Sequence, residues 1–459
     1  MQAELVNEDL CGSPLKTARS RATRHLARQA NKYRSAFTLV ASRGAAILAQ
    51  FAAQLAVGTM AGASGLGILQ LFTSWTCIAG EVLARGLPTQ AMRQVSVSFA
   101  NERGDQIIAT LRDSRDKILR FWLASCLLAA LPTYFLLRSV EPSDWTQFGW
   151  LVIGVAAAAP LFSLLRLFSE TLKAMGSPLA AVALESLTSP IALLLVCAVC
   201  WMAGKTVVAL ALVVTFTASL VITSVALRYM LRARLLSFSG VAPKYAQSAD
   251  RPAAPRGELV YLWGAGVLSI CFLQLPFLVM PLYVDTAQIG VFAIAHKLIN
   301  IVTTLLLLMA AVFGPAFARC AAQGTPEDLL RLLGRTQLIS TAVFLPISIA
   351  LIVLAEPLAA LFGEEFSDLK IYLAILAAGH LVNAITGLSG VLLNMAGAAS
   401  RELSTLIMAL IAALIGSALV GPRYGAIGLV VVFSGSIALK NLASYLLARQ
   451  LLKSRSTLK

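Results

Sequence analysis

The chain is dominated by apolar stretches that are each long enough to cross a lipid bilayer. A spanning helix needs about 20 predominantly apolar residues, and such stretches recur along almost the whole sequence. Twelve spans are predicted, at residues 36–60, 66–87, 119–138, 148–170, 179–202, 206–228, 259–284, 288–313, 338–358, 368–393, 402–421 and 425–447. This pattern predicts an all-α polytopic membrane protein.

The composition agrees with this class. The chain is 58% hydrophobic and 13% charged, with a mean hydropathy of +0.80, whereas a soluble domain has about 25% charged residues. The seven cysteines show no disulfide framework. Cys197 and Cys200 form a CxxC without a second pair, so they are expected to be small wall residues of a helix.

The first 35 residues are polar and basic and have no apolar core, so no cleavable signal peptide is expected. Because this basic segment directly precedes a membrane span, a tail held inside by its charge is favoured over nucleic-acid binding. An even number of spans places both termini on one side. The candidate outside loops carry few cations, namely Arg138, Lys205, Lys370 and Arg423. The positive-inside rule therefore predicts that both termini lie in the cytoplasm.

A linker rich in Pro, Ala, Ser and Arg divides the spans into two sets of six. The halves resemble one another weakly: LGIL at 66–69 answers IGVF at 289–292, and LKAMG at 172–176 answers LNMAG at 393–397. Two parallel repeats would enclose a central cavity. The predicted organisation is a basic cytoplasmic tail (1–35), an N-terminal six-helix lobe (36–228), a cytoplasmic linker (229–257), a C-terminal six-helix lobe (258–447) and a cytoplasmic tail (448–459).

Three predicted spans have a polar face, which a helix turned wholly to lipid would not carry. On the second span, polar residues recur at steps of three or four and share one side of the helix. The first and eighth spans have comparable faces. The candidate cavity residues are Arg43, Gln50, Gln54, Gln70, Ser74, Glu81, Arg85, His296, Lys297 and Asn300. His380 and Asn383 on the tenth span are further candidates, whereas Lys440 is expected to pack between helices.

Two cations decide how this cavity is interpreted. A charge in mid-helix costs about 2.5–3.5 kcal/mol on insertion scales, so Arg43 either snorkels to the interface or faces a ligand. Lys297 lies further from both surfaces, which favours a functional role. Glu81 and Arg85 are spaced i,i+4, as are Arg166 and Glu170, and each pair is expected to form an internal ion pair. For Glu81, a proton-coupling role is the alternative.

No motif for nucleotide, metal or cofactor chemistry is apparent, and no cofactor is predicted. Gly204-Lys205-Thr206 resembles the end of a phosphate-binding loop, but Val199 replaces the required glycine. Transport would then draw on ion gradients or on the membrane potential.

The two six-span lobes, the basic tail, the SGLGILQLF turn into the second span and the QIGVFAIAHKL turn into the eighth resemble one known group. This group is the polysaccharide-exporter branch of the multidrug/oligosaccharidyl-lipid/polysaccharide (MOP) flippase superfamily; the LNMAG segment fits as well. The resemblance implies a flippase for undecaprenyl-diphosphate-linked oligosaccharides in the bacterial inner membrane. It also implies alternating access around a cationic cavity, for which Arg43 and Lys297 are the candidates. The seventh span departs from that pattern, since no Lys or Arg lies between Glu258 and Asp285.

Other functions remain open at this point. A multidrug antiporter of the same superfamily would need cavity carboxylates, for which Glu81 is the candidate. A polysaccharide polymerase or ligase would need a longer outside loop, and a non-transporting scaffold would not need the polar faces. Expected partners are the lipid-linked oligosaccharide and the membrane, with possible proton or sodium coupling and a polysaccharide polymerase machinery; no nucleic acid is expected.

Overall fold

The computed structural model describes residues 14–101, 103–139, 149–236, 256–323 and 325–457. The described chain is helical throughout, as the sequence predicted. Its helices are α1 (Pro14–Ala84), α2 (Leu87–Ala100), α3 (Gly104–Ser139), α5 (Gly149–Ala174), α6 (Pro178–Met202), α7 (Ala209–Leu236), α8 (Arg256–Val279), α9 (Thr286–Gln323), α10 (Pro326–Val353), α11 (Ala355–Phe362), α12 (Leu369–Thr386), α13 (Ser389–Met395) and α14 (Ala399–Thr457), with short 3-10 turns η1 (Met280–Leu282) and η2 (Glu364–Phe366). Helices satisfy their own backbone hydrogen bonds, which a bilayer interior requires.

Nine helices of the described residues are long and apolar enough to cross a membrane. The longest helices, α1 and α14, each contain two predicted spans, because each is broken at a glycine with a positive φ. These glycines are Gly62 (φ 68°) and Gly425 (φ 54°), a conformation that side-chain-bearing residues seldom adopt. The remaining predicted span, 119–138, lies within α3. The twelve predicted spans therefore lie mostly on helices, although 338–358 runs from α10 into α11 and 368–393 runs from α12 into α13. The predicted fold class is confirmed.

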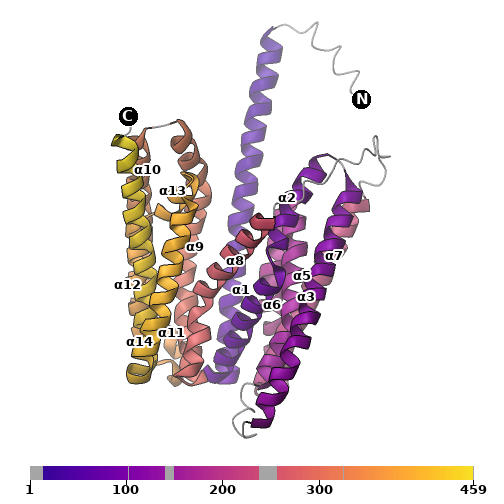
Figure 1. Ribbon diagram of the computed structural model, residues 1–459, viewed down its shortest axis with the longest axis vertical. Coiled ribbons are helices and arrows are strands. Elements are labelled where there is room, and N and C mark those ends of the chain that lie inside the picture. Colours follow the sequence, from indigo (N-terminus) through magenta and orange to yellow (C-terminus); the bar gives the residue numbers. More distant parts are fainter. Residues whose placement is uncertain (1–13, 102, 140–148, 237–255, 324, 458–459) are drawn as a thin grey trace.

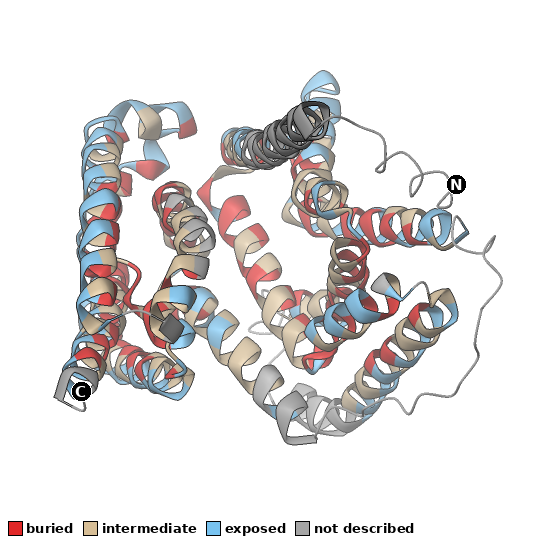
Figure 2. Ribbon diagram, turned by 90° about the horizontal axis from the view of Figure 1, so that it is seen from above, coloured by how far each residue is buried: buried red, intermediate tan, exposed pale blue. Residues whose placement is uncertain are grey.

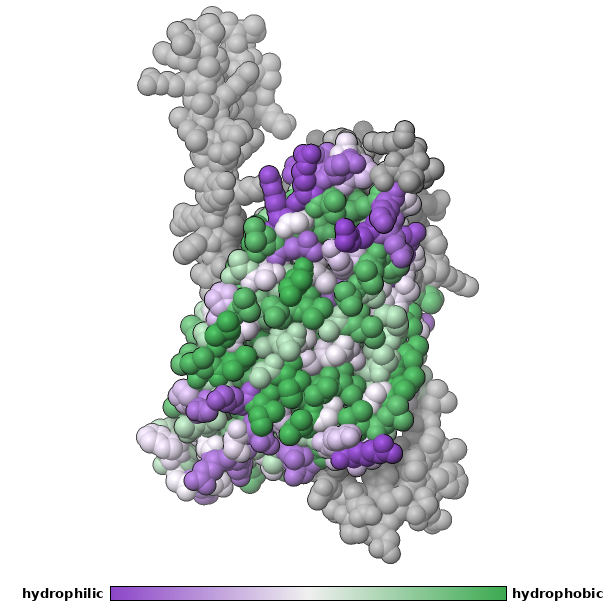
Figure 3. Space-filling model, turned by 90° about the vertical axis from the view of Figure 1, so that its left-hand side faces the viewer, coloured by the Kyte–Doolittle hydropathy of each residue, from purple (hydrophilic) through white to green (hydrophobic). Residues whose placement is uncertain are grey.

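The helices form two lobes, an N-lobe (α1–α7) and a C-lobe (α8–α14), which lie side by side in Figure 1. From above, exposed residues are frequent on the outer faces of both groups (Figure 2). The C-lobe face in Figure 3 has an apolar belt between two polar ends, as a membrane-spanning surface should. Exposed apolar side chains of this lobe include Ile349, Ile411, Leu419 and Val431.

The predicted tail and linker boundaries fall partly on helices. Helix α1 begins at Pro14, α7 continues to Leu236, and α14 continues to Thr457. Residues 237–255, at the centre of the predicted linker, lie outside the described residues. The division of the chain at this linker stays a prediction.

The two lobes meet at the end of the molecule opposite the termini (Figure 1). There Gly67 of α1 faces Gly290 of α9. A Cβ on Gly67 would lie 1.9 Å from the Thr286 carbonyl oxygen, and a Cβ on Gly290 would lie 2.0 Å from the Ala63 carbonyl oxygen. The contact is reciprocal, and it joins the positions that the two sequence repeats, 66–69 and 289–292, place as equivalents.

Side chains complete the closure at this end. The Glu365 carboxylate accepts a hydrogen bond of 2.8 Å from the Ala63 N–H, at the start of the second half of α1. Phe51 packs edge-on against Phe362, with ring centroids 6.0 Å apart. One apolar core cluster draws buried residues from both lobes, among them Val57 and Phe366. The lobes are therefore closed at this end.

Candidate functional site

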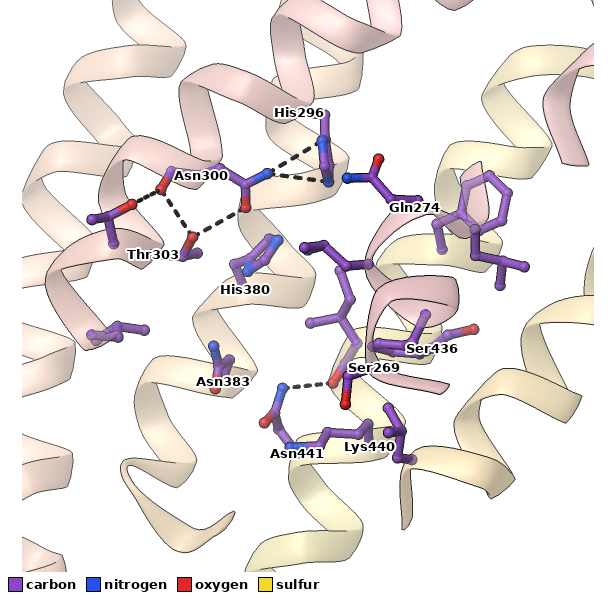
Figure 4. Close-up of a pocket in the computed structure, with 18 of the residues that line it drawn as sticks. Ser269, Gln274, His296, Asn300, Thr303, His380, Asn383, Ser436, Lys440 and Asn441 are labelled. Carbon is purple, nitrogen blue, oxygen red and sulfur yellow. Dashed lines mark hydrogen bonds between the residues drawn. The ribbon is translucent and has the colours of Figure 1, made fainter. Parts of the chain in front are cut away.

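A cavity of about 940 Å³ lies above the closed end, between the two halves of the molecule. This volume is near the top of the range of about 300–1,000 Å³ for small-molecule sites. Most of the lining belongs to C-lobe helices, and α1 supplies the N-lobe side. The polar and charged lining residues are Gln50, Gln70, Ser269, Gln274, His296, Lys297, Asn300, Thr303, Thr304, His380, Asn383, Asn394, Glu402, Ser436, Lys440 and Asn441; ten of them are labelled in Figure 4.

The structure brings half of the sequence-predicted candidates to this cavity. Gln50, Gln70, His296, Lys297 and Asn300 line it, and their role in substrate binding stays a prediction. His380 and Asn383, the further candidates on the tenth predicted span, line it as well.

The other candidates lie elsewhere. Gln54 is buried and its Oε1 has no hydrogen-bond partner among the described residues, but it is not part of the lining. Ser74, Glu81 and Arg85 are not among the residues that line the cavity. Arg43 belongs to α1, but its side chain is outside the described part of the structure.

A chain of hydrogen bonds ties the cavity wall of α1 to α8. The Gln70 amide donates to Ser74 Oγ at 3.0 Å, and Ser74 Oγ donates to Gln274 Oε1 at 2.8 Å. One residue further on, the Trp75 indole donates to the Phe277 carbonyl oxygen at 2.8 Å. The seventh predicted span thus docks on the N-lobe, although it belongs to the C-lobe in sequence.

A neutral polar cluster lies on α9. The Asn300 Nδ2 lies 3.2 Å from the His296 ring nitrogens, and Thr303 Oγ1 donates to Asn300 Oδ1 at 3.1 Å. The His296 ring stacks on Phe292 and meets Phe277 edge-on, each at a centroid distance of 5.6 Å. These contacts fix the imidazole and the amide against the cavity wall (Figure 4).

The cavity contains one unpaired cation among the described side chains. Lys297 makes no ion pair with a described carboxylate, whereas Lys440 Nζ lies 2.5 Å from Glu402 Oε1. Glu402 also accepts a hydrogen bond of 2.7 Å from Ser444. The sequence predicted that Lys440 packs between helices. In the structure it also lines the cavity, where it forms a neutral pair with Glu402.

The predicted ion pair between Glu81 and Arg85 is wrong. Glu81 Oε2 instead lies 3.2 Å from Arg166 Nη1 of α5. Arg85 follows the last residue of α1 and has a φ of 50°, so it leaves the helical path on which an i,i+4 contact depends. Its guanidinium lies over the Phe121 ring, 4.8 Å from the centroid.

The predicted pair between Arg166 and Glu170 is also wrong, because each of these residues has another partner. Arg166 is occupied by Glu81, and Glu170 accepts from Lys173 at 2.9 Å. Lys173 also contacts Glu185 of α6 at 3.2 Å. These groups hold α1, α5 and α6 of the N-lobe together and do not line the cavity.

Several lining residues escaped the sequence interpretation, notably Ser269, Gln274 and Glu402. One available signal was the spacing of Ser436, Lys440 and Ser444, which places three polar side chains on one face of an apolar helix. Glu402 was hidden by its place beside Arg401 at the start of a predicted span, where charged residues are common.

Comparisons with known proteins agree with this architecture. Residues 176–371 match the model of a family described as polysaccharide biosynthesis protein. An inward-facing multidrug resistance MATE transporter of the MOP superfamily matches with a TM-score of 0.70 and 14% identity, over 90% of this chain and 96% of that chain. The lipid II flippase MurJ in an inward closed conformation matches at 0.61 and 11%, over 90% and 87%. Curated proteins gave no match.

An outward-facing MATE transporter of the MOP superfamily gives a TM-score of 0.51 with 13% identity, over 92% of this chain and 94% of that chain. This structure is therefore more similar to the inward-facing transporter than to the outward-facing one. The resemblance inferred from the sequence is therefore confirmed at the level of the fold: the chain has the two-lobed fold of the MATE transporters and of the MurJ flippase.

Proposed function

We propose that the protein flips an undecaprenyl-diphosphate-linked oligosaccharide across the bacterial inner membrane for surface polysaccharide biosynthesis. The supporting observation is the unpaired Lys297 ammonium in a large, otherwise neutral cavity. A diphosphate brings negative charge that such a cation can hold in a charge-assisted hydrogen bond. The match to a polysaccharide biosynthesis family over 176–371 supports the same substrate class.

Transport would proceed by alternating access of the two lobes. With both termini in the cytoplasm, the end closed by Gly67 and Gly290 faces outward, so the cavity loads from inside. An inside-negative potential favours outward movement of an anion by about 2.3 kcal/mol per charge per 100 mV. The potential alone can therefore drive export, and proton or sodium coupling would add to it. A polysaccharide polymerase machinery would use the exported substrate.

A multidrug antiporter is the second candidate, because MATE transporters share the fold. Such a transporter needs a carboxylate to hold a cationic drug. Among the described lining residues, Glu402 is the one carboxylate, and Lys440 neutralises it. The charge of the cavity therefore favours an anionic substrate. A membrane polymerase or ligase is less favoured, since the matches are to transporters and flippases.

The test is a deletion strain complemented with variants of Lys297. Wild type should restore surface polysaccharide, Lys297→Gln should restore little, and Lys297→Arg should restore much of it because the charge is kept. Lys205→Gln, in the exposed loop between α6 and α7, is the matched control and should behave as wild type. Membrane abundance is measured in parallel.

A deletion that leaves surface polysaccharide intact but sensitises the cells to cationic drugs would favour the antiporter. Normal export by a double variant, Arg43→Ala with Lys297→Ala, would reject the cationic cavity.

A further inference from the structure

His380 is a buried polar side chain that lines the cavity without a hydrogen-bond partner. Its side chain belongs to α12, and the residue is 7% exposed. Both ring nitrogens lack a partner among the described residues. Phe344 lies against the ring, at a centroid distance of 6.5 Å, while Figure 4 shows the imidazole directed toward the cavity.

Both nitrogens are covered by neighbouring atoms in this structure, so a ligand in the cavity reaches them once the wall around His380 shifts. A buried donor or acceptor left unsatisfied costs about 1–3 kcal/mol, and a neutral imidazole presents one of each. Asn383 lies three residues further along α12, on the same face of the helix, and its amide also offers both donors and an acceptor. The α12 wall is therefore complementary to a ligand that donates and accepts.

The neighbouring cavity wall, on α9, has the same polar character. Asn300 is held between His296 and Thr303 by hydrogen bonds of 3.2 and 3.1 Å. The two walls together contain imidazoles, amides and a hydroxyl. Lys297 follows His296 in sequence and therefore points about 100° further round the helix.

The hydrogen-bond donors and acceptors of these two walls indicate which ligand chemistry fits them. A sugar hydroxyl both donates and accepts, and an acetamido group carries one N–H and one carbonyl. A bare phosphate only accepts in its ionised form, and a lipid tail does neither. Phe272 and Phe433 line the same cavity and offer the apolar contact that the carbon faces of a sugar ring require.

We propose that His380 and Asn383 of α12, with His296, Asn300 and Thr303 of α9, form a subsite for a neutral sugar ring, separate from the Lys297 ammonium. The inference rests on the proposed function, because it divides that substrate into a phosphate held by Lys297 and a sugar held by the neutral walls. It assigns selection of the sugar to the C-lobe.

The experiment measures binding to the full-length protein in nanodiscs. The probes are undecaprenyl diphosphate and undecaprenyl-diphosphate-N-acetylglucosamine. In a second measurement, the thermal stability of the protein in a non-glycosidic detergent is followed with a panel of soluble neutral disaccharides. The variants are His380→Leu, which removes both ring nitrogens, His380→Gln, which keeps a donor and an acceptor, and Asn383→Leu. Ser348→Ala is the matched control, since Ser348 is also buried and unpartnered but lies outside the cavity.

We expect His380→Leu to weaken binding of the sugar-bearing lipid about tenfold, as the loss of one or two hydrogen bonds implies, and to leave undecaprenyl diphosphate binding unchanged. His380→Gln should recover part of the loss, and Ser348→Ala should bind as wild type. Lys297→Gln should weaken both lipids. Asn383→Leu gives the same test if His380→Leu does not fold.

The proposal fails if both leucine variants bind the sugar-bearing lipid as wild type does, or if they weaken both lipids equally. The proposed function fails separately. If wild type binds neither lipid but is stabilised by a disaccharide through His380, the subsite stands and the diphosphate substrate does not. If both lipids bind with equal affinity and no disaccharide stabilises the protein, the subsite is rejected while the proposed function survives.

Discussion

The contact between Gly67 and Gly290 predicts that a single methyl group will open the closed end of the molecule. In Gly67→Ala the new Cβ would lie 1.9 Å from the Thr286 carbonyl oxygen and 3.2 Å from the Gly290 nitrogen. These are backbone atoms, which cannot rotate out of the way. A carbon normally approaches a carbonyl oxygen to about 3.3–3.6 Å, so α1 and α9 must separate by more than an ångström.

In the proposed alternating access the lobes part at this end in the outward-open state, so the cost of that separation falls on the closed state. Inserting a methyl group into a well-packed contact costs about 1–3 kcal/mol. Each 1.4 kcal/mol is tenfold in an equilibrium, so the population ratio should move by about fivefold to 150-fold toward the open state. Gly290→Ala should act in the same direction. The double variant should show less than the sum, because either methyl group already breaks the shared contact.

Distances between spin labels at exposed positions of the two lobes measure this shift. Lys205, in the loop between α6 and α7, and Leu361, on α11, both lie at the closed end. In Gly67→Ala, the fraction of molecules with a longer distance between the two spin labels should rise. The matched control is Gly435→Ala on α14, whose Cβ would meet nothing within 4 Å. An unchanged distance distribution in Gly67→Ala, or an equal change in the control, would refute the reasoning.

Two further predictions concern the N-lobe ion pair and the topology. Glu81→Gln should lower membrane abundance, at a cost of about 3 kcal/mol, the lower end for buried pairs, because Arg166 is 31% exposed. Adding Arg166→Gln should partly restore abundance on immunoblots, while adding Arg85→Gln should not. An abundant Glu81→Gln whose export no longer depends on pH would instead indicate proton coupling. Cysteines introduced at 359–367 should react with an impermeant reagent added outside intact cells, and cysteines at 240–255 should not; labelling of the second set would reverse the proposed orientation.

Hydropathy predicted the helices well, because the bilayer fixes the length and the apolar character of a spanning segment. The repeat pattern predicted that the two halves of the chain are similar. Apolar length alone located the spans, although α1 and α14 each hold two of them around a glycine break. The alignment of 66–69 with 289–292 predicted equivalence, and the reciprocal glycine contact shows that equivalence in space.

Side-chain partners were harder to predict, because periodicity reports only neighbours on one helix. Periodicity predicted Arg85 as the partner of Glu81, but Glu81 pairs with Arg166 of another helix. Likewise, the pairing of Lys440 with Glu402 joins the two halves of α14, which are far apart in sequence. The cavity face of α9 was predictable, since His296 and Asn300 recur at i,i+4 within one helix.

The two repeats are alike where they touch and unlike where they face the cavity. At the closing contact each repeat contributes a glycine, since no larger residue fits either position. A few helical turns further along, the repeat alignment makes Ser74 equivalent to Lys297 and Glu81 equivalent to Thr304. Ser74 hydrogen-bonds to Gln274 of α8, and Glu81 forms an ion pair with Arg166. Lys297 and Thr304, by contrast, line the cavity. Most of the polar lining lies on C-lobe helices. The repeats are therefore symmetric at the glycine contact that closes the lobes, and they differ in the polar chemistry that they bring to the cavity.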